Sequence, residues 1–282
     1  MVNACHYTSI SNLKNMLGYA ETGYINIWAS SAYEMDDQTE MNFGYPFIKS
    51  VIESYETNLD IGDNQIFTSI LRPQEKYISG PDDKYYLPKS KTPFIISFTR
   101  AINDEKMWKE YGDDSKGVCL LFDSNMLVPP NNQFEKFLLD IAYINWNNLD
   151  LEIWYALAET IIRGIKIAHV FTPILKYSND SLTLKTWILK KLCPVISASI
   201  KMEKYIDEQE LRWIHIYDLE KSKTRKNFAD RTIHYIEEQI PIDYLKGIMC
   251  GPKCFQQEEI RNFCYARHIN FVTNNSLNDL KQ

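Results

Sequence analysis

Two glutamates two residues apart, Glu208 and Glu210, have the residue types and spacing for chemistry. In an extended segment both side chains point the same way, and like charges held that close raise the pKa of at least one carboxyl unless a cation or a ligand hydroxyl compensates. Arg212 lies on the same face and is the nearest cation in sequence. Such a pair suits acid–base or electrostatic catalysis. The plainer alternative is a solvated turn leading into an edge strand.

A regular element must hold these glutamates in place, and the sequence predicts a strand directly after them. Residues 211–217 alternate between two faces, which is typical of a β-strand. Residues 93–99 predict another strand, and the continuous apolar run 118–122 predicts a buried central strand. Between them, Met107, Trp108 and Tyr111 lie at helical spacing in a short helix over residues 104–111. Ser9 is the expected N-cap of a helix over residues 10–17.

The remaining pattern predicts one α+β domain over residues 1–282, with a curved, mainly antiparallel sheet. Further strands are expected at residues 24–31, 137–143, 232–236, 244–250 and 271–272, and a helix at 256–268. Residues 221–226 form a charged loop in this prediction. Long apolar-periodic segments at 151–167 and 182–204 predict a helical insertion over residues 150–204, in which Pro194 breaks the second segment.

Composition narrows the class of protein. The chain has 282 residues and a formal net charge of −6, which disfavours broad electrostatic binding to nucleic acid while allowing a local basic groove. No signal peptide is visible at the start, and the longest apolar stretch is interrupted by charged residues, so we expect a cytoplasmic protein without a membrane span. Six scattered cysteines then predict reduced, buried thiols, because their match to zinc-ligand spacing is loose.

Seven segments, in this order, resemble the bacterial family DUF2971. They are His6-Tyr7 and the stretches at 27–31 (IWASS), 35–40 (MDDQTE), 96–99 (ISFT), 107–112 (MWKEYG), 116–123 (KGVCLLFD) and 208–212 (EQELR). The resemblance runs over most of the chain. It also implies a distant similarity to the ADP-ribosyltransferase fold, in which a split antiparallel sheet cradles NAD.

This similarity assigns roles to particular residues. It implies that Glu210 is the catalytic carboxylate, that Glu208 is a general base toward the acceptor, and that neutral His6 holds ribose hydroxyls. Tyr111 would stack on the nicotinamide, and Ser97 would bond sugar or phosphate. The similarity also places three more residues near NAD: Tyr7, where such enzymes usually have a small glycine, Ser30 and Arg212. The plainer interpretation of each residue alone is a structural one.

Three functions follow from the sequence. The first is an enzyme that cleaves the nicotinamide–ribose bond of NAD and transfers ADP-ribose to a protein, a nucleic acid or water, as a toxin or antiphage effector would. The second is a binding module of the same fold without the chemistry, which senses a nucleotide or a partner. The third is a metal-dependent nuclease or hydrolase that uses Asp36, Asp37 and Glu40 with Mg²⁺.

Overall fold

The chain has an α+β fold with a mainly antiparallel open sheet, as the sequence predicts. The computed structural model describes residues 2–18, 23–35, 92–127, 135–145, 194–226, 230–273 and 276–277, and the single residues 44, 48, 50, 51, 53 and 159. All but residue 159 of the 150–193 stretch, most of the expected helical insertion, lies outside the described residues.

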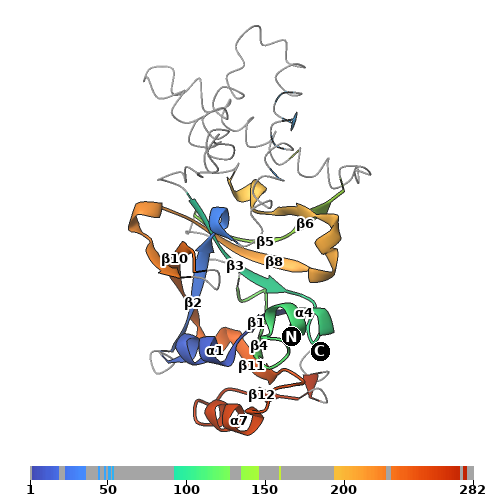
Figure 1. Ribbon diagram of the computed structural model, residues 1–282, viewed down its shortest axis with the longest axis vertical. Coiled ribbons are helices and arrows are strands. Elements are labelled where there is room, and N and C mark those ends of the chain that lie inside the picture. The colour runs from blue at the N-terminus through green and yellow to red at the C-terminus, as the bar shows by residue number, and fades with distance from the viewer. Residues whose placement is uncertain are drawn as a thin grey trace.

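Ten strands of the described part form one sheet. They are β1 (Ala4–Thr8), β2 (Tyr24–Ser31), β3 (Thr92–Thr99), β4 (Val118–Phe122), β5 (Lys136–Asp140), β8 (Glu210–Tyr217), β9 (Lys223–Lys226), β10 (Thr232–Pro241), β11 (Leu245–Cys250) and β12 (Phe271–Val272). The order is β12-β11-β4-β1-β3-β2-β10-β9, with β8 paired to β3 and β5 paired to β8 (Figure 1). Its β11–β12 pair is parallel. A separate parallel pair joins β6 (Ala142–Ile144) to β7 (Ile200–Met202).

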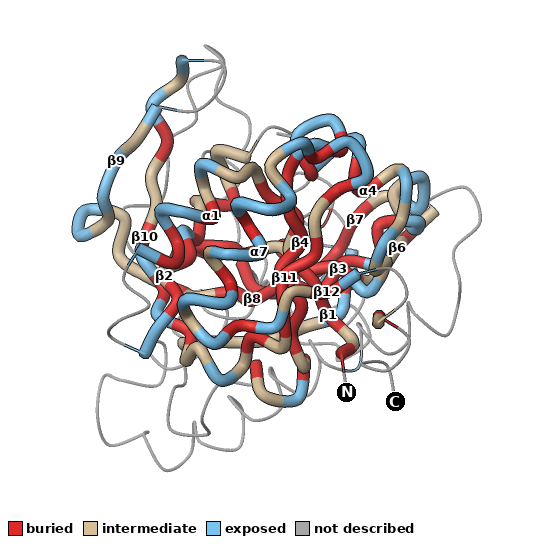
Figure 2. Tube along the Cα trace, turned by 90° about the horizontal axis from the view of Figure 1, so that it is seen from below, coloured by how far each residue is buried: buried red, intermediate tan, exposed pale blue. Residues whose placement is uncertain are grey.

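Helices cover both faces of this sheet. On one face, α1 (Ile10–Leu17) and α7 (Gln257–Tyr265) contribute Leu13 and Ile260 to a core that includes Phe98 and Leu120. On the other face, α4 (Glu105–Tyr111) packs Trp108 into a second core. In Figure 2 the strands at the centre are largely buried, while α1, α7 and β9 carry exposed residues.

Local signals explain where α1 and α4 begin. The Ser9 side chain accepts a hydrogen bond from the backbone N–H of Asn12 at 3.2 Å, which confirms the predicted cap of α1. The Asp104 side chain accepts from the N–H of Met107 at 3.0 Å and so fixes the start of α4. Tyr111 is the last residue of α4, and Gly112 follows it as the C-cap.

Several predicted elements are corrected by the structure. Residues 223–226, expected in a loop, form β9 and pair with β10. Residues 200–202, expected at the end of a helix, form β7 because they pair with β6. The single strand expected over 137–143 is divided into β5 and β6 by Ile141. Strand β8 is not an edge strand, since β3 and β5 lie on its two sides.

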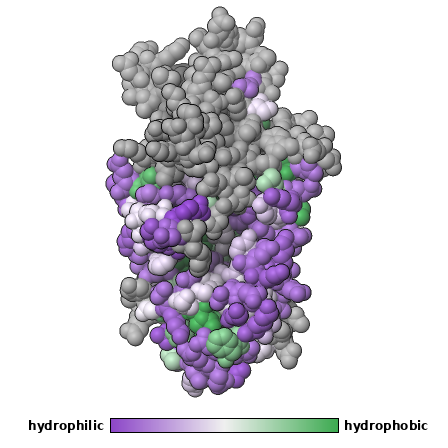
Figure 3. Space-filling model, viewed as in Figure 1, coloured by the Kyte–Doolittle hydropathy of each residue, from purple (hydrophilic) through white to green (hydrophobic). Residues whose placement is uncertain are grey.

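On the face shown in Figure 3, the described side chains are mostly hydrophilic. Among the described residues, no helix is both long enough and apolar enough to span a bilayer.

Candidate active site

The sheet divides at β3. Along one edge, β3 pairs with β8 over its whole length, from Thr92 to Thr99. On the other edge it pairs with β2 at Phe94 and Ile95 and with β1 only at Thr99. Within the described part of the chain, no strand pairs with residues 96–98 on this second edge. The neighbouring strands therefore diverge here and leave room for a site.

A cavity of about 340 Å³ lies at this point. The volume falls at the lower end of the range typical of small-molecule sites. Six of the predicted site residues line it: His6, Tyr7, Ser97, Tyr111, Glu208 and Glu210. They come from β1, β3, α4 and the entry to β8, so residues more than 200 positions apart meet in one place.

Glu210 is held as an ionised carboxylate. Its side chain is 5% exposed and accepts two hydrogen bonds from Arg212, at 2.7 Å from Nε and 2.9 Å from Nη2. The Lys201 ammonium lies 3.1 Å from the same carboxylate. Burial by itself raises the pKa of Glu210, but Arg212, Lys201 and a hydrogen bond from the Ser97 side chain lower it to about 2.

Glu208 lies beside Glu210, although the backbone between them is not extended as predicted. Glu208 ends the 3-10 helix Glu203–Glu208, and Gln209 adopts a left-handed conformation with φ 43° before β8 begins. The Glu208 side chain accepts a 2.9 Å hydrogen bond from the Tyr111 hydroxyl and a 2.6 Å hydrogen bond from Lys201. Both glutamates are also buried, so the solvated turn is excluded.

The geometry fixes the hydrogen-bonding state of His6. Its Nδ1 lies 2.8 Å from the carbonyl oxygen of Ser97, and because a carbonyl only accepts, Nδ1 is the donor. Burial lowers the pKa of His6 and outweighs the opposite effect of this hydrogen bond, so the ring is neutral near pH 7. In that tautomer Nε2 is an acceptor. This bond also bridges the diverging strands β1 and β3.

Three residues predicted to lie near NAD make other contacts in the structure, although Tyr7 also lines the cavity. The Arg212 side chain is 1% exposed and does not line the cavity; it lies behind Glu210 and also donates to the Ala198 carbonyl at 2.7 Å. Ser30 also lies away from the cavity lining and accepts a 3.2 Å hydrogen bond from Arg225. The Tyr7 hydroxyl donates to the Ala101 carbonyl at 2.9 Å, so it anchors the loop after β3. Asp36, Asp37 and Glu40 lie outside the described residues.

Sequence reasoning missed seven other residues that line the cavity: Cys5, Met35, Phe98, Thr99, Met107, Lys201 and Tyr205. Lys201 is the most consequential, because it contacts both glutamates while its side chain is 6% exposed. Its ammonium also lies 4.8 Å from the centre of the Tyr205 ring. A lysine in a predicted helix gave no local signal of this position.

One comparison with known proteins bears on this site. Residues 107–213 match the model of a family described as "Protein of unknown function (DUF2971)". The match supports a relationship to DUF2971. It includes Tyr111, Lys201, both glutamates and Arg212, but not His6 or Ser97. Searches of curated proteins and of solved structures gave no match.

Proposed function

We propose that this chain cleaves the nicotinamide–ribose bond of NAD and transfers ADP-ribose to a macromolecule or to water. One observation carries the proposal: His6, Ser97, Tyr111, Glu208 and Glu210 line one cavity where β1 and β3 diverge. This is the arrangement that the distant similarity to ADP-ribosyltransferases implies.

Cleavage passes through a state with positive charge on the ribose. The carbon–nitrogen bond breaks, its electron pair leaves with nicotinamide, and the ribose carbon becomes oxocarbenium-like, as in glycoside hydrolysis. The pKa of about 2 keeps Glu210 ionised at every physiological pH, so its charge is in place before the reaction. The acceptor then bonds to the ribose carbon and loses a proton to a base or to solvent.

The other side chains have matching roles in this proposal. Neutral His6 offers Nε2 as an acceptor for a ribose hydroxyl. The Tyr111 side chain is 46% exposed at the cavity, and its hydroxyl is held by Glu208, which presents the ring for stacking on nicotinamide. Glu208, which also lines the cavity, is the general base in this proposal.

A second candidate is a nucleotide-binding module without catalysis. The observation that favours it is that two cations, Arg212 and Lys201, already compensate the charge of Glu210. A carboxylate balanced in this way stabilises a developing cation less than one facing it alone. Such a module, like the enzyme, would bind NAD in the cavity.

Incubation with NAD separates the two candidates. The purified chain is mixed with NAD, nicotinamide release is followed by chromatography, and NAD binding is measured by calorimetry. Release by the wild type that falls at least tenfold in Glu210→Gln supports the enzyme. Binding without release supports the module. Absence of both overturns the proposal that this cavity is an NAD site.

A further inference from the structure

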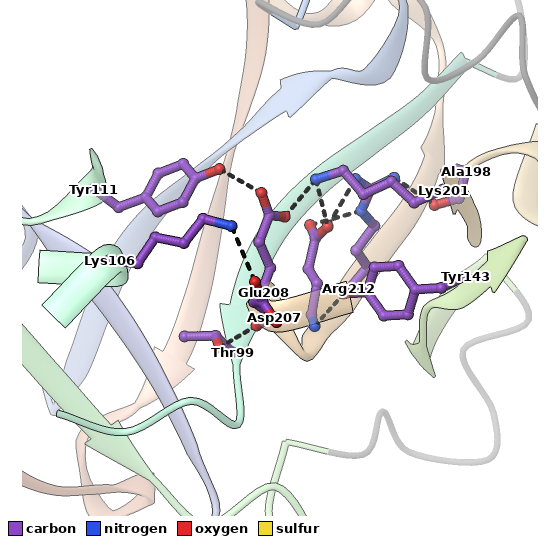
Figure 4. Close-up of polar contacts among 10 residues, drawn as sticks. Thr99, Lys106, Tyr111, Tyr143, Ala198, Lys201, Asp207, Glu208 and Arg212 are labelled. Atoms are coloured by element: carbon purple, nitrogen blue, oxygen red, sulfur yellow. Dashed lines mark hydrogen bonds and ion pairs between the residues drawn. The ribbon is translucent and has the colours of Figure 1, made fainter. Parts of the chain in front are cut away.

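The group that sets the charge of the cavity is Lys201, a residue outside the predicted site. It lies on β7, at the register position opposite Tyr143 of β6. Its Nζ is 2.6 Å from Glu208 Oε2 and 3.1 Å from Glu210 Oε2, and all three side chains are nearly inaccessible to solvent. The ammonium group therefore bridges the two carboxylates, and Figure 4 shows its contact with Glu208.

The two carboxylates need this bridge. Because both contact one nitrogen, their Oε2 atoms are within about 6 Å of each other, the range in which like charges disfavour joint ionisation. Arg212 cannot balance both, since its Nε and Nη2 bind Glu210 and its Nη1 binds the Ala198 carbonyl. Among the described side chains, the ion pair that Glu208 makes is with Lys201.

The uncharged neighbours do not replace the cation. Tyr111 donates to Glu208, and burial raises its pKa, so it remains a neutral phenol. Tyr143 accepts a 2.7 Å hydrogen bond from the Glu210 N–H, and burial raises its pKa to about 12. His6 is neutral for the reason given above. Tyr205 contacts the Lys201 ammonium through its ring.

We propose that Lys201 is a positioning residue that holds Glu208 and Glu210 together as a charge-balanced pair of carboxylates. The backbone is built for this arrangement. The 3-10 helix after β7 and the left-handed turn at Gln209 return the chain so that Lys201, Glu208 and Glu210 meet within ten residues of sequence. The inference concerns the same site as the proposed NAD chemistry and rests on that proposal for its function. It explains how two carboxylates can both be ionised side by side in the cavity.

Three variants test this role: Lys201→Met, Lys201→Arg, and the double variant Lys201→Met/Glu208→Gln. Melting temperatures are measured by circular dichroism at pH 4.5 and pH 7.5. Without the cation, one carboxyl has a raised pKa in the folded state. We expect this pKa to lie above the ordinary value of 4.5, so the cost of ionising the carboxyl is small at pH 4.5 and grows as the pH rises.

Lys201→Met should therefore lose more melting temperature at pH 7.5 than at pH 4.5. The difference is roughly 3 °C for each unit by which the carboxyl pKa rises above 4.5. Lys201→Arg should keep the wild-type pH profile. The double variant removes one charge of each sign, so it should lack the extra loss at pH 7.5.

An equal loss at both pH values, or an extra loss that Glu208→Gln does not remove, overturns the inference, because lost packing does not depend on pH. If Lys201→Met does not fold at pH 7.5, we expect the double variant to fold there. A double variant that also fails to fold at pH 7.5 overturns the inference. The melting test needs no NAD. A wild type that releases no nicotinamide would thus refute the proposed function while leaving this result standing.

Discussion

Replacement of Glu210 by glutamine is the sharpest test of the site, because the structure gives the magnitude of two separate effects. Glutamine keeps the shape but removes the charge that faces Arg212 and Lys201. It also places an amide N–H₂ among groups that are themselves donors, so part of the hydrogen bonding is lost. Arg212, at 1% exposure, is left as a buried cation without its carboxylate.

The first effect is on stability. Lowering the pKa of Glu210 from 4.5 to about 2 corresponds to roughly 3 kcal/mol of favourable interaction in the folded state at pH 7. Breaking a buried ion pair costs a similar amount, about 3–5 kcal/mol. We expect Glu210→Gln to lower the melting temperature by about 5–10 °C at pH 7.

The second effect is on rate. Loss of one well-placed electrostatic contact to the transition state is worth about 3 kcal/mol, or roughly a hundredfold in nicotinamide release. NAD affinity should change much less, because ground-state binding rests on other contacts as well. The assay is run below the melting temperature of the variant, after circular dichroism has shown that it is folded.

The matched control is Asp207→Asn, which also removes one acidic charge. The Asp207 side chain is 72% exposed and lies 3.5 Å from Lys106. Because exposed ion pairs contribute little, this variant should keep wild-type stability and rate. A folded Glu210→Gln protein that releases nicotinamide as fast as the wild type would refute the catalytic role of this carboxylate.

Three further predictions follow from the same geometry. Glu208→Gln should lower transfer to a macromolecular target more than NAD hydrolysis. Parallel assays of target labelling and nicotinamide release test this, and equal losses in the two assays would contradict it. His6→Phe removes the Nε2 acceptor and should weaken NAD binding about fivefold, for one hydrogen bond of roughly 1 kcal/mol; an unchanged Kd by calorimetry contradicts it. Acid should remove the stability due to Glu210, because the contribution of its lowered pKa is complete above pH 4.5 and is lost as the pH falls toward 2. The free energy of unfolding in urea should therefore differ less between pH 5 and pH 3 in Glu210→Gln than in the wild type.

Local sequence patterns predicted the strands that carry the site. The apolar run at β4 has all five residues buried, and the alternation at β8 marked a strand whose entry holds Glu210. Helix α4 was predictable because Met107, Trp108 and Tyr111 share helical spacing and Asp104 caps the start. In each case the signal lies within a few neighbouring residues.

The elements that were missed depend on distant partners. Strand β7 has three residues and exists through its pairing with β6, more than 50 positions earlier in the chain. Strand β9 is charged and largely exposed, so its composition resembles a loop, and pairing with β10 decides its conformation. A short strand of this kind gives no periodic signal of its own.

The acidic pair shows how the same limit applies to a site. Strand periodicity puts residues two apart on one face, so Arg212 could be paired with Glu210 from the sequence, and the structure confirms that contact. No position in β8 could supply a cation for Glu208, because Glu208 precedes the strand and the left-handed turn at Gln209 separates it from the alternation. Its cation comes from β7, which is placed only once β6 is in position. The charge balance of the cavity is therefore a property of the tertiary structure, and a variant of Lys201 tests it more directly than any variant within the acidic motif.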